Sequence, residues 1–193
     1  MNQFELYFSL GITHILDIEG YDHILFVIAL CSIYTILDWR KILVLVTAFT
    51  IGHSLTLALA TLKFISVNAD LIELLIPVTI AITSASNLIN TQAKEGRWIQ
   101  LNYLFALFFG LIHGLGFSNF LKSLLGRESS ILEPLLAFNL GLELGQLVIV
   151  VAFLAFTFIL LHILNIKQKL WILISSSMVF LLSVYMIYEA NFG

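Results

Sequence analysis

Long apolar stretches separated by short polar segments dominate the pattern along the chain. A helix needs about 20 mostly apolar residues to cross a membrane, and in lipid only helices or closed barrels satisfy their backbone. Because these stretches lack the alternation of a transmembrane barrel strand, we predict an all-α, polytopic transmembrane helix bundle. Its approximately six spans are expected at residues 21–37, 42–62, 71–90, 98–120, 132–153 (with apolar sequence continuing to His162) and 170–188.

The first 20 residues differ from these spans because they mix apolar side chains with Glu5, His14 and Asp17. This mixture predicts an N-terminal interfacial helix over residues 1–20 rather than a seventh span. No basic residue precedes Arg40, whereas a secretory signal has a positive segment before its apolar core, so we expect the N-terminus to be retained. Nothing resembling a linker interrupts the chain, which predicts one transmembrane domain over residues 1–193.

The composition supports a membrane protein. Hydrophobic residues make up 60% of the 193 positions and charged residues only 11%, too few polar side chains to coat a soluble enzyme or to keep a chain disordered. The net charge of -3 gives no basic surface for nucleic acid, and no G-x-x-x-x-G-K-[ST] loop predicts a nucleotide site. The single cysteine, Cys31, excludes an intrachain disulfide or a cluster of thiolate ligands.

Basic residues near the ends of the spans predict the orientation, because Lys and Arg are retained in the cytoplasm. The first, third and fifth predicted loops carry six of them: Arg40, Lys41, Lys94, Arg97, Lys167 and Lys169. The second and fourth loops carry three: Lys63, Lys122 and Arg127. Both termini are therefore expected outside the cytoplasm.

Ionisable and amide side chains occur inside four of the predicted spans, where each needs a partner or a function. Spacings of three or four residues, counted from Glu19 in the first group, from Thr50 in the second and along Asn139, Glu143 and Gln146 in the last, place the members of each group on one helical face. The first group is Glu19, Asp22 and His23, and the second is His53 and Ser54. The third is His113 alone, and the fourth is Asn139, Glu143 and Gln146. Given the expected orientation, their faces can meet in one outward-facing pocket.

Such a pocket predicts a metal site. Neutral imidazole suits Ni, Co and Zn, and mixed imidazole and carboxylate ligation is loose enough for a transported ion to leave. The expected ligands are Asp22, His23, His53, His113 and Glu143, supported by Glu19, Ser54, Asn139 and Gln146. Structural alternatives remain open: His53 could bond a neighbouring helix, Asp22 could cap one, and His162 could lie at the water interface.

Four segments of the sequence carry a family resemblance. They are GITHILDIEGYDHILF at 11–26, FTIGHSLTL at 49–57, FFGLIHGLGFSNF at 108–120 and FNLGLELGQL at 138–147. Together, and in this order, they resemble the HupE/UreJ family of bacterial membrane proteins, and most closely its second branch. The resemblance implies a multi-pass metal permease of the bacterial inner membrane, associated with nickel or cobalt supply to hydrogenases and ureases.

The family motifs match this chain in part. The first is a His, five residues and then Asp-His; Asp22 and His23 match it, but seven residues separate His14 from Asp22, so His14 fits less well as a ligand. The second places His-Gly shortly before a Glu. His113 and Gly114 match its beginning, but no acid follows closely, which makes Glu143 the candidate carboxylate.

The leading hypothesis is therefore a secondary transporter of a divalent transition metal, most simply nickel or cobalt. One alternative is an intramembrane zinc-dependent hydrolase, in which the same cluster holds zinc and Ser54 assists. This hypothesis lacks the H-E-x-x-H helix that would support it. A second alternative is a membrane metal sensor or assembly factor, which the short loops disfavour. The lipid bilayer and the metal ion are the expected partners, and the sequence leaves open a homo-oligomer.

Overall fold

The structure, a computed structural model, describes residues 2–89, 91, 97–125 and 131–192. Its elements are α1 (Gln3–Leu16), α2 (Asp22–Cys31), η1 (Ile36–Asp38), α3 (Trp39–Thr61), α4 (Ala69–Ile89), α5 (Arg97–Leu125), α6 (Leu132–Phe158), η2 (Ile159–Ile163) and α7 (Gln168–Phe192). These ranges contain no strand. The prediction of an all-α bundle is confirmed.

Five helices are long and apolar enough to cross a membrane: Ile36–Thr61, Ala69–Ile89, Ile99–Ser118, Leu132–Ile163 and Gln168–Phe192. They correspond to the second through sixth predicted spans, with ends that differ by several residues. The fourth of them includes the apolar continuation to His162, where the last turn, η2, is π-helical.

The first predicted span is shorter than expected. α2 has 10 residues, which at 1.5 Å per residue is about 15 Å, half the thickness of a bilayer core. The helix ends before Thr35, whose backbone N–H and hydroxyl both donate to the carboxylate of Asp38 and so begin η1. The prediction of one continuous helix over residues 21–37 is wrong: α2 ends at Cys31, and the capping box at Thr35 begins the separate element η1.

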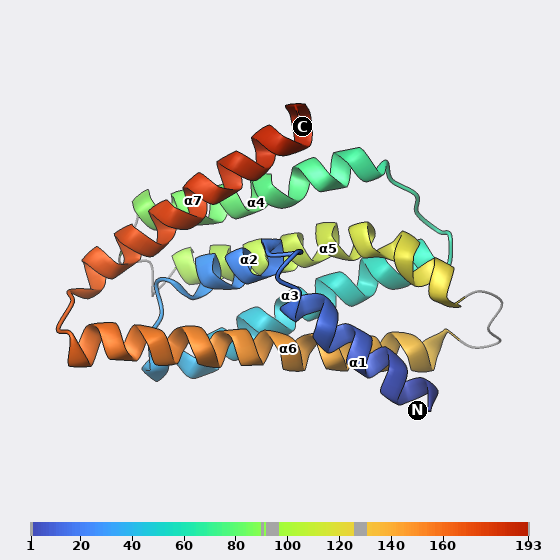
Figure 1. Ribbon diagram of the computed structural model, residues 1–193, viewed down its shortest axis with the longest axis horizontal. Coiled ribbons are helices and arrows are strands. Elements are labelled where there is room, and N and C mark those ends of the chain that lie inside the picture. The colour runs from blue at the N-terminus through green and yellow to red at the C-terminus, as the bar shows by residue number, and fades with distance from the viewer. Residues whose placement is uncertain (1, 90, 92–96, 126–130, 193) are drawn as a thin grey trace.

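Helices α1 and α2 follow one another in the same direction along the bundle, with a bend at residues 17–21 (Figure 1). α1 packs on α6, where a Cβ atom added at Gly141 would overlap the carbonyl oxygen of Phe8. Only glycine permits the two backbones to approach so closely. The predicted interfacial helix thus packs against the bundle, and its position at a membrane interface stays a prediction.

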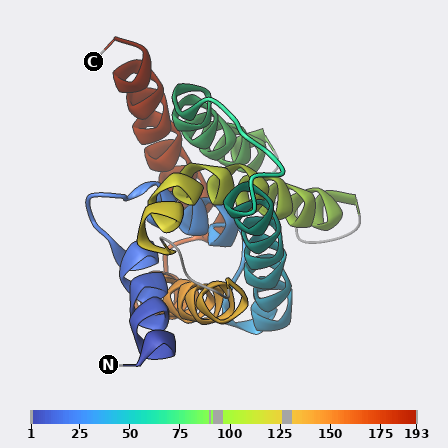
Figure 2. The ribbon, with the colours of Figure 1, turned by 90° about the vertical axis from the view of Figure 1, so that its right-hand side faces the viewer.

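α2 lies inside the bundle. Seven of its ten residues are buried, as expected for a helix that is apolar on every side. Figure 2 shows α4 and α7 side by side on one flank, and α6 with α1 and α3 on the other. The amide of Asn87 in α4 donates to the carbonyl oxygen of Ala29 at 2.7 Å, which satisfies one of the unpaired carbonyls at the end of α2.

The helices α1, α4 and α6 begin at the same end of the bundle, which we call the N-terminal end (Figure 1). The orientation of this end stays a prediction. Of the residues used to predict it, Lys94 and Arg127 lie outside the described residues, as does Asn90 at the end of the third predicted span.

Candidate metal centre

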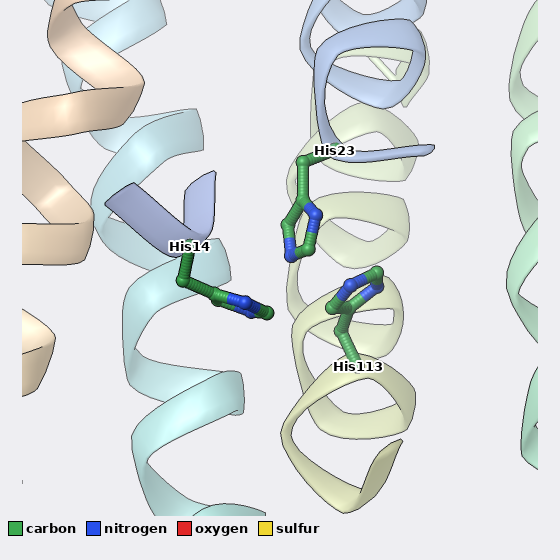
Figure 3. Close-up of side chains that lie close together, drawn as sticks. All are labelled: His14, His23 and His113. Carbon is green, nitrogen blue, oxygen red and sulfur yellow. The ribbon is translucent and has the colours of Figure 1, made fainter. Parts of the chain in front are cut away.

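Three histidines from three helices converge between α1, α2 and α5. His14, His23 and His113 each offer a nitrogen, and these three nitrogens lie within 4.8 Å of one another. Their rings point toward a common space in Figure 3. His23 and His113 are buried, with 3% and 4% of their surface exposed, and His14 is partly buried. Imidazole nitrogens gathered in this way could hold a transition metal ion.

The three rings lie close to one another. The ring centroid of His23 lies 3.8 Å from that of His113 and 4.6 Å from that of His14. The centroids of His14 and His113 are 6.5 Å apart. The sequence brings them together because α1 ends two residues after His14, the chain turns, and α2 begins one residue before His23.

Asp22 connects two of these histidines. Its Oδ1 atom lies 2.9 Å from Nδ1 of His23, and its Oδ2 atom lies 3.5 Å from Nε2 of His113. Oδ1 also accepts a hydrogen bond from the backbone N–H of His23 at 2.8 Å. A carboxylate that accepts from a ring nitrogen fixes the tautomer of a histidine and leaves the other nitrogen as a lone-pair donor.

One ring nitrogen of each of four histidines lacks a partner among the described residues. Four buried nitrogen atoms have no hydrogen-bond partner among the described residues: Nε2 of His14, His23 and His53, and Nδ1 of His113. In His23 and His113, the unpartnered atom is the one that does not face Asp22. A buried polar atom without a partner is unfavourable, so each of these nitrogens is available to a ligand.

His53 lies beside this group on α3. Its ring centroid is 6.4 Å from those of both His14 and His113, and the residue is fully buried. α3 and α5 approach closely here, since a Cβ atom added at Gly114 would overlap the backbone oxygen of His53. The structure therefore brings together Asp22, His23, His53 and His113 from the expected ligands, and adds His14.

The expected carboxylate Glu143 takes a different position. Its Oε1 atom accepts a hydrogen bond from the hydroxyl of Thr47 at 3.1 Å, and it is not in the group of close metal-ligating side chains found among the described residues. On the same side of α6, Gln146 accepts from Thr50 at 3.2 Å. These two residues join α6 to α3 next to the histidines.

Two other supporting residues are placed as follows. The hydroxyl of Ser54 donates to the carbonyl of Thr50 at 2.6 Å, within its own helix. Glu19 lies in the exposed segment between α1 and α2, where its backbone N–H donates to Asp17 at 3.0 Å. Neither side chain belongs to the group of close nitrogen ligands in the described residues.

Phenylalanine rings surround the histidines, a feature that the sequence reasoning missed. The ring of Phe117 lies 4.0 Å from His14, and that of Phe109 lies 4.9 Å from His113. Phe138 lies between His14 and His53, at 5.7 and 6.0 Å from their centroids. A signal was present in the sequence, because Phe109 precedes His113 by one helical turn, as Phe49 precedes His53.

Two cavities flank the bend between α1 and α2. One, of about 570 Å³, lies between α1 and α5 and is lined by His14, Asp17 and Phe117. The other, of about 420 Å³, lies between the bend, α4 and α7 and carries four carboxylates. These belong to Glu19, Asp22, Glu73 and Glu189. Each cavity therefore includes a residue of the histidine group or its carboxylate partner.

Comparison with known proteins agrees with these features. A family model described as HupE / UreJ protein matches residues 1–190. Searches of curated proteins and of solved structures found no match. Five apolar helices of spanning length and this whole-chain match identify a multi-pass membrane protein. The chain belongs to the HupE/UreJ family.

Proposed function

We propose that this protein is a secondary transporter of a divalent transition metal ion, with nickel or cobalt as the best candidates. The observation that carries the proposal is the group of imidazoles in which each ring has one buried nitrogen without a hydrogen-bond partner among the described residues. Neutral imidazole is a borderline donor, suited to Ni, Co, Zn and Cu(II). The association of the HupE/UreJ family with nickel and cobalt transport supports the first two.

The residues have separate tasks in this proposal. His14, His23 and His113 bind the ion, which is the substrate, through nitrogen. Asp22 supplies a negative charge beside the ion and holds the rings of His23 and His113 in place. The site has one nearby carboxylate, and its imidazoles are neutral. Its negative charge is therefore smaller than the charge of a divalent ion, which keeps binding weak enough for the ion to be released.

The bend between α1 and α2 favours transport over permanent storage. His14 is near the end of α1 and His23 is at the start of α2, so the ligands lie on two short helices rather than on one rigid rod. Interrupted helices with binding residues at the break occur in many secondary transporters. A change in the angle between α1 and α2 would separate the two nitrogens and weaken the site.

The cavities supply access from the N-terminal end. Pro77 lines the cavity with four carboxylates, which we call the acidic cavity. It is eight residues from the start of α4, or about 12 Å along the helix. An ion in this cavity meets Asp22, which faces both the cavity and the histidines. The predicted orientation places this end outside the cytoplasm and makes the movement an uptake.

The test is uptake of radioactive nickel and cobalt into proteoliposomes that contain the purified protein. His23→Ala and His113→Ala should each abolish saturable uptake, whereas His162→Ala, at the opposite end of α6, should leave it unchanged. Uptake by the two site variants at the wild-type rate would overturn the proposal. No specific observation favours the zinc hydrolase, because the Ser54 hydroxyl is engaged by the Thr50 carbonyl.

A further inference from the structure

Asn139 holds His53 in one tautomer. The amide nitrogen of Asn139 donates to the carbonyl of Leu135 at 2.7 Å, which leaves its Oδ1 atom to face His53. Oδ1 lies 3.3 Å from Nδ1 of His53. An amide oxygen can only accept, so Nδ1 of His53 must carry the proton. The lone pair of the ring is then on Nε2.

That Nε2 atom is buried and has no hydrogen-bond partner in the described parts of the chain. The ring itself is held between Phe49 and Phe138, whose centroids lie 5.8 and 6.0 Å away. These rings offer no acceptor or donor to Nε2. The lone pair of His53 Nε2 therefore lies among apolar rings, without a hydrogen bond from the described residues and close to the other histidines.

The distance between His53 and the other rings is compatible with a shared ion. When two imidazoles bind one tetrahedral ion through bonds of about 2.0 to 2.1 Å, simple geometry puts their ring centroids roughly 5 to 6 Å apart. The centroid of His53 is 6.4 Å from those of His14 and His113. His53 stands outside the three histidines whose nitrogens lie within 4.8 Å of one another, so its ring has to move toward them for Nε2 to reach a shared ion.

We infer that His53 is the fourth imidazole ligand of the transported ion and that Asn139 is a positioning residue, which fixes His53 in the Nδ1–H tautomer. The inference rests on the proposed function and extends it. The resulting site has four neutral nitrogen ligands, from α1, α2, α3 and α5, with the carboxylate of Asp22 outside them. Such a set suits Ni, Co or Zn and lacks the thiolates that Cu(I) prefers.

The tautomer can be measured without any substitution. In the metal-free wild-type protein, labelled with ¹⁵N-histidine, the ring nitrogen shifts of His53 distinguish Nδ1–H from Nε2–H. Assignment uses the spectrum of His53→Ala, in which that signal is missing. The Nδ1–H form is expected. An Nε2–H form at His53 would overturn the inference.

The ligand role is tested by X-ray absorption of the cobalt-loaded protein. The wild type should show four imidazoles around cobalt, whereas His53→Ala and Asn139→Leu should both show three. The cobalt affinity of Asn139→Leu should fall by roughly 10- to 100-fold, as is usual when the partner of a metal-bound histidine is lost, and that of His53→Ala by at least as much. Asn139→Asp keeps an acceptor oxygen and should retain four imidazoles.

Gln146→Leu is the matched control, because Gln146 also links α6 to α3 but bonds Thr50 rather than a histidine. It should retain the wild-type spectrum and affinity. Wild-type behaviour of His53→Ala and Asn139→Leu would overturn the inference, while a loss of binding in His23→Ala would still support the proposed function. If His23→Ala and His113→Ala also bind cobalt normally, both proposals fail.

Discussion

The carboxylate of Asp22 links two helices at the histidine group, because its Oδ2 atom lies 3.5 Å from Nε2 of His113 on α5 while its Oδ1 atom lies 2.9 Å from Nδ1 of His23 on α2. One acid therefore orients two rings that come from different parts of the chain. It is also the residue shared by the acidic cavity and the histidines.

The first prediction concerns this acid. Asp22→Asn keeps the size of the side chain but removes its charge, so the cobalt affinity should fall by roughly 10- to 100-fold. Isothermal titration calorimetry with cobalt measures the change. Asp70→Asn, at the exposed start of α4, is the control and should bind as the wild type does. Equal affinity in the two variants would argue against a role for Asp22.

The second prediction concerns His14, which the family spacing disfavoured as a ligand. We expect His14→Ala to lose metal binding as completely as His23→Ala, because the two nitrogens lie in the same group. His162→Ala is the control, since His162 stacks on Phe158 in the last turns of the fourth long helix, with its centroid 4.4 Å away. Elemental analysis of the purified variants gives the bound metal per protein.

The third prediction tests the contact between α3 and α5. A Cβ atom at Gly114 would overlap the backbone oxygen of His53 and the hydroxyl of Thr56, so Gly114→Val should force the helices apart. Overpacking of this kind costs about 1 to 3 kcal/mol, and the displaced His53 should weaken metal binding. Thermal unfolding in detergent measures the stability.

Gly116→Ala serves as the control for this variant. Its added Cβ atom would lie 3.3 Å from the Cγ2 atom of Ile72, a side-chain atom that can move. The unfolding temperature of Gly116→Ala should stay close to that of the wild type. An equal loss of stability in both variants would contradict the close approach of α3 and α5 at Gly114.

The fourth prediction concerns the acidic cavity. Carboxylates concentrate cations near an entrance, and salt screens this effect over roughly 10 Å at 0.1 M. Glu73→Gln with Glu189→Gln should therefore raise the KM for cobalt uptake several-fold at low ionic strength, with little change in maximal rate. The difference should shrink in high salt. Glu133→Gln, an exposed acid at the start of α6, should leave the KM unchanged at every salt concentration.

The five long helices could be predicted because each is a continuous apolar stretch of membrane-spanning length. The end of α2 could not be found from hydropathy, because residues 32–37 remain mostly apolar. The signal that a separate element follows is local: the Thr35 hydroxyl and backbone N–H donate to Asp38 three residues later and begin η1. A search for capping boxes inside the apolar stretches would have located it.

Most of the histidine group could be predicted because ionisable side chains inside apolar helices usually face the bundle interior and interact with one another. The number of residues between His14 and Asp22 disfavours His14 as a ligand. The bend at residues 17–21 nevertheless brings His14 close to His23 in space. Glu143 was assigned by its helical face. It lies one turn beyond Asn139, about 6 Å farther along α6, and there Thr47 rather than a histidine faces it.

The phenylalanine rings around the histidines would restrict which ions the proposed site accepts. Phe49, Phe109, Phe117 and Phe138 pack around the histidines of the proposed site, and their rings cannot accept hydrogen bonds from the water that an ion carries as a carboxylate would. An ion at the proposed site would exchange part of its hydration shell for imidazole nitrogens. Magnesium gives up water reluctantly and prefers oxygen ligands, so even a large excess of it would be rejected.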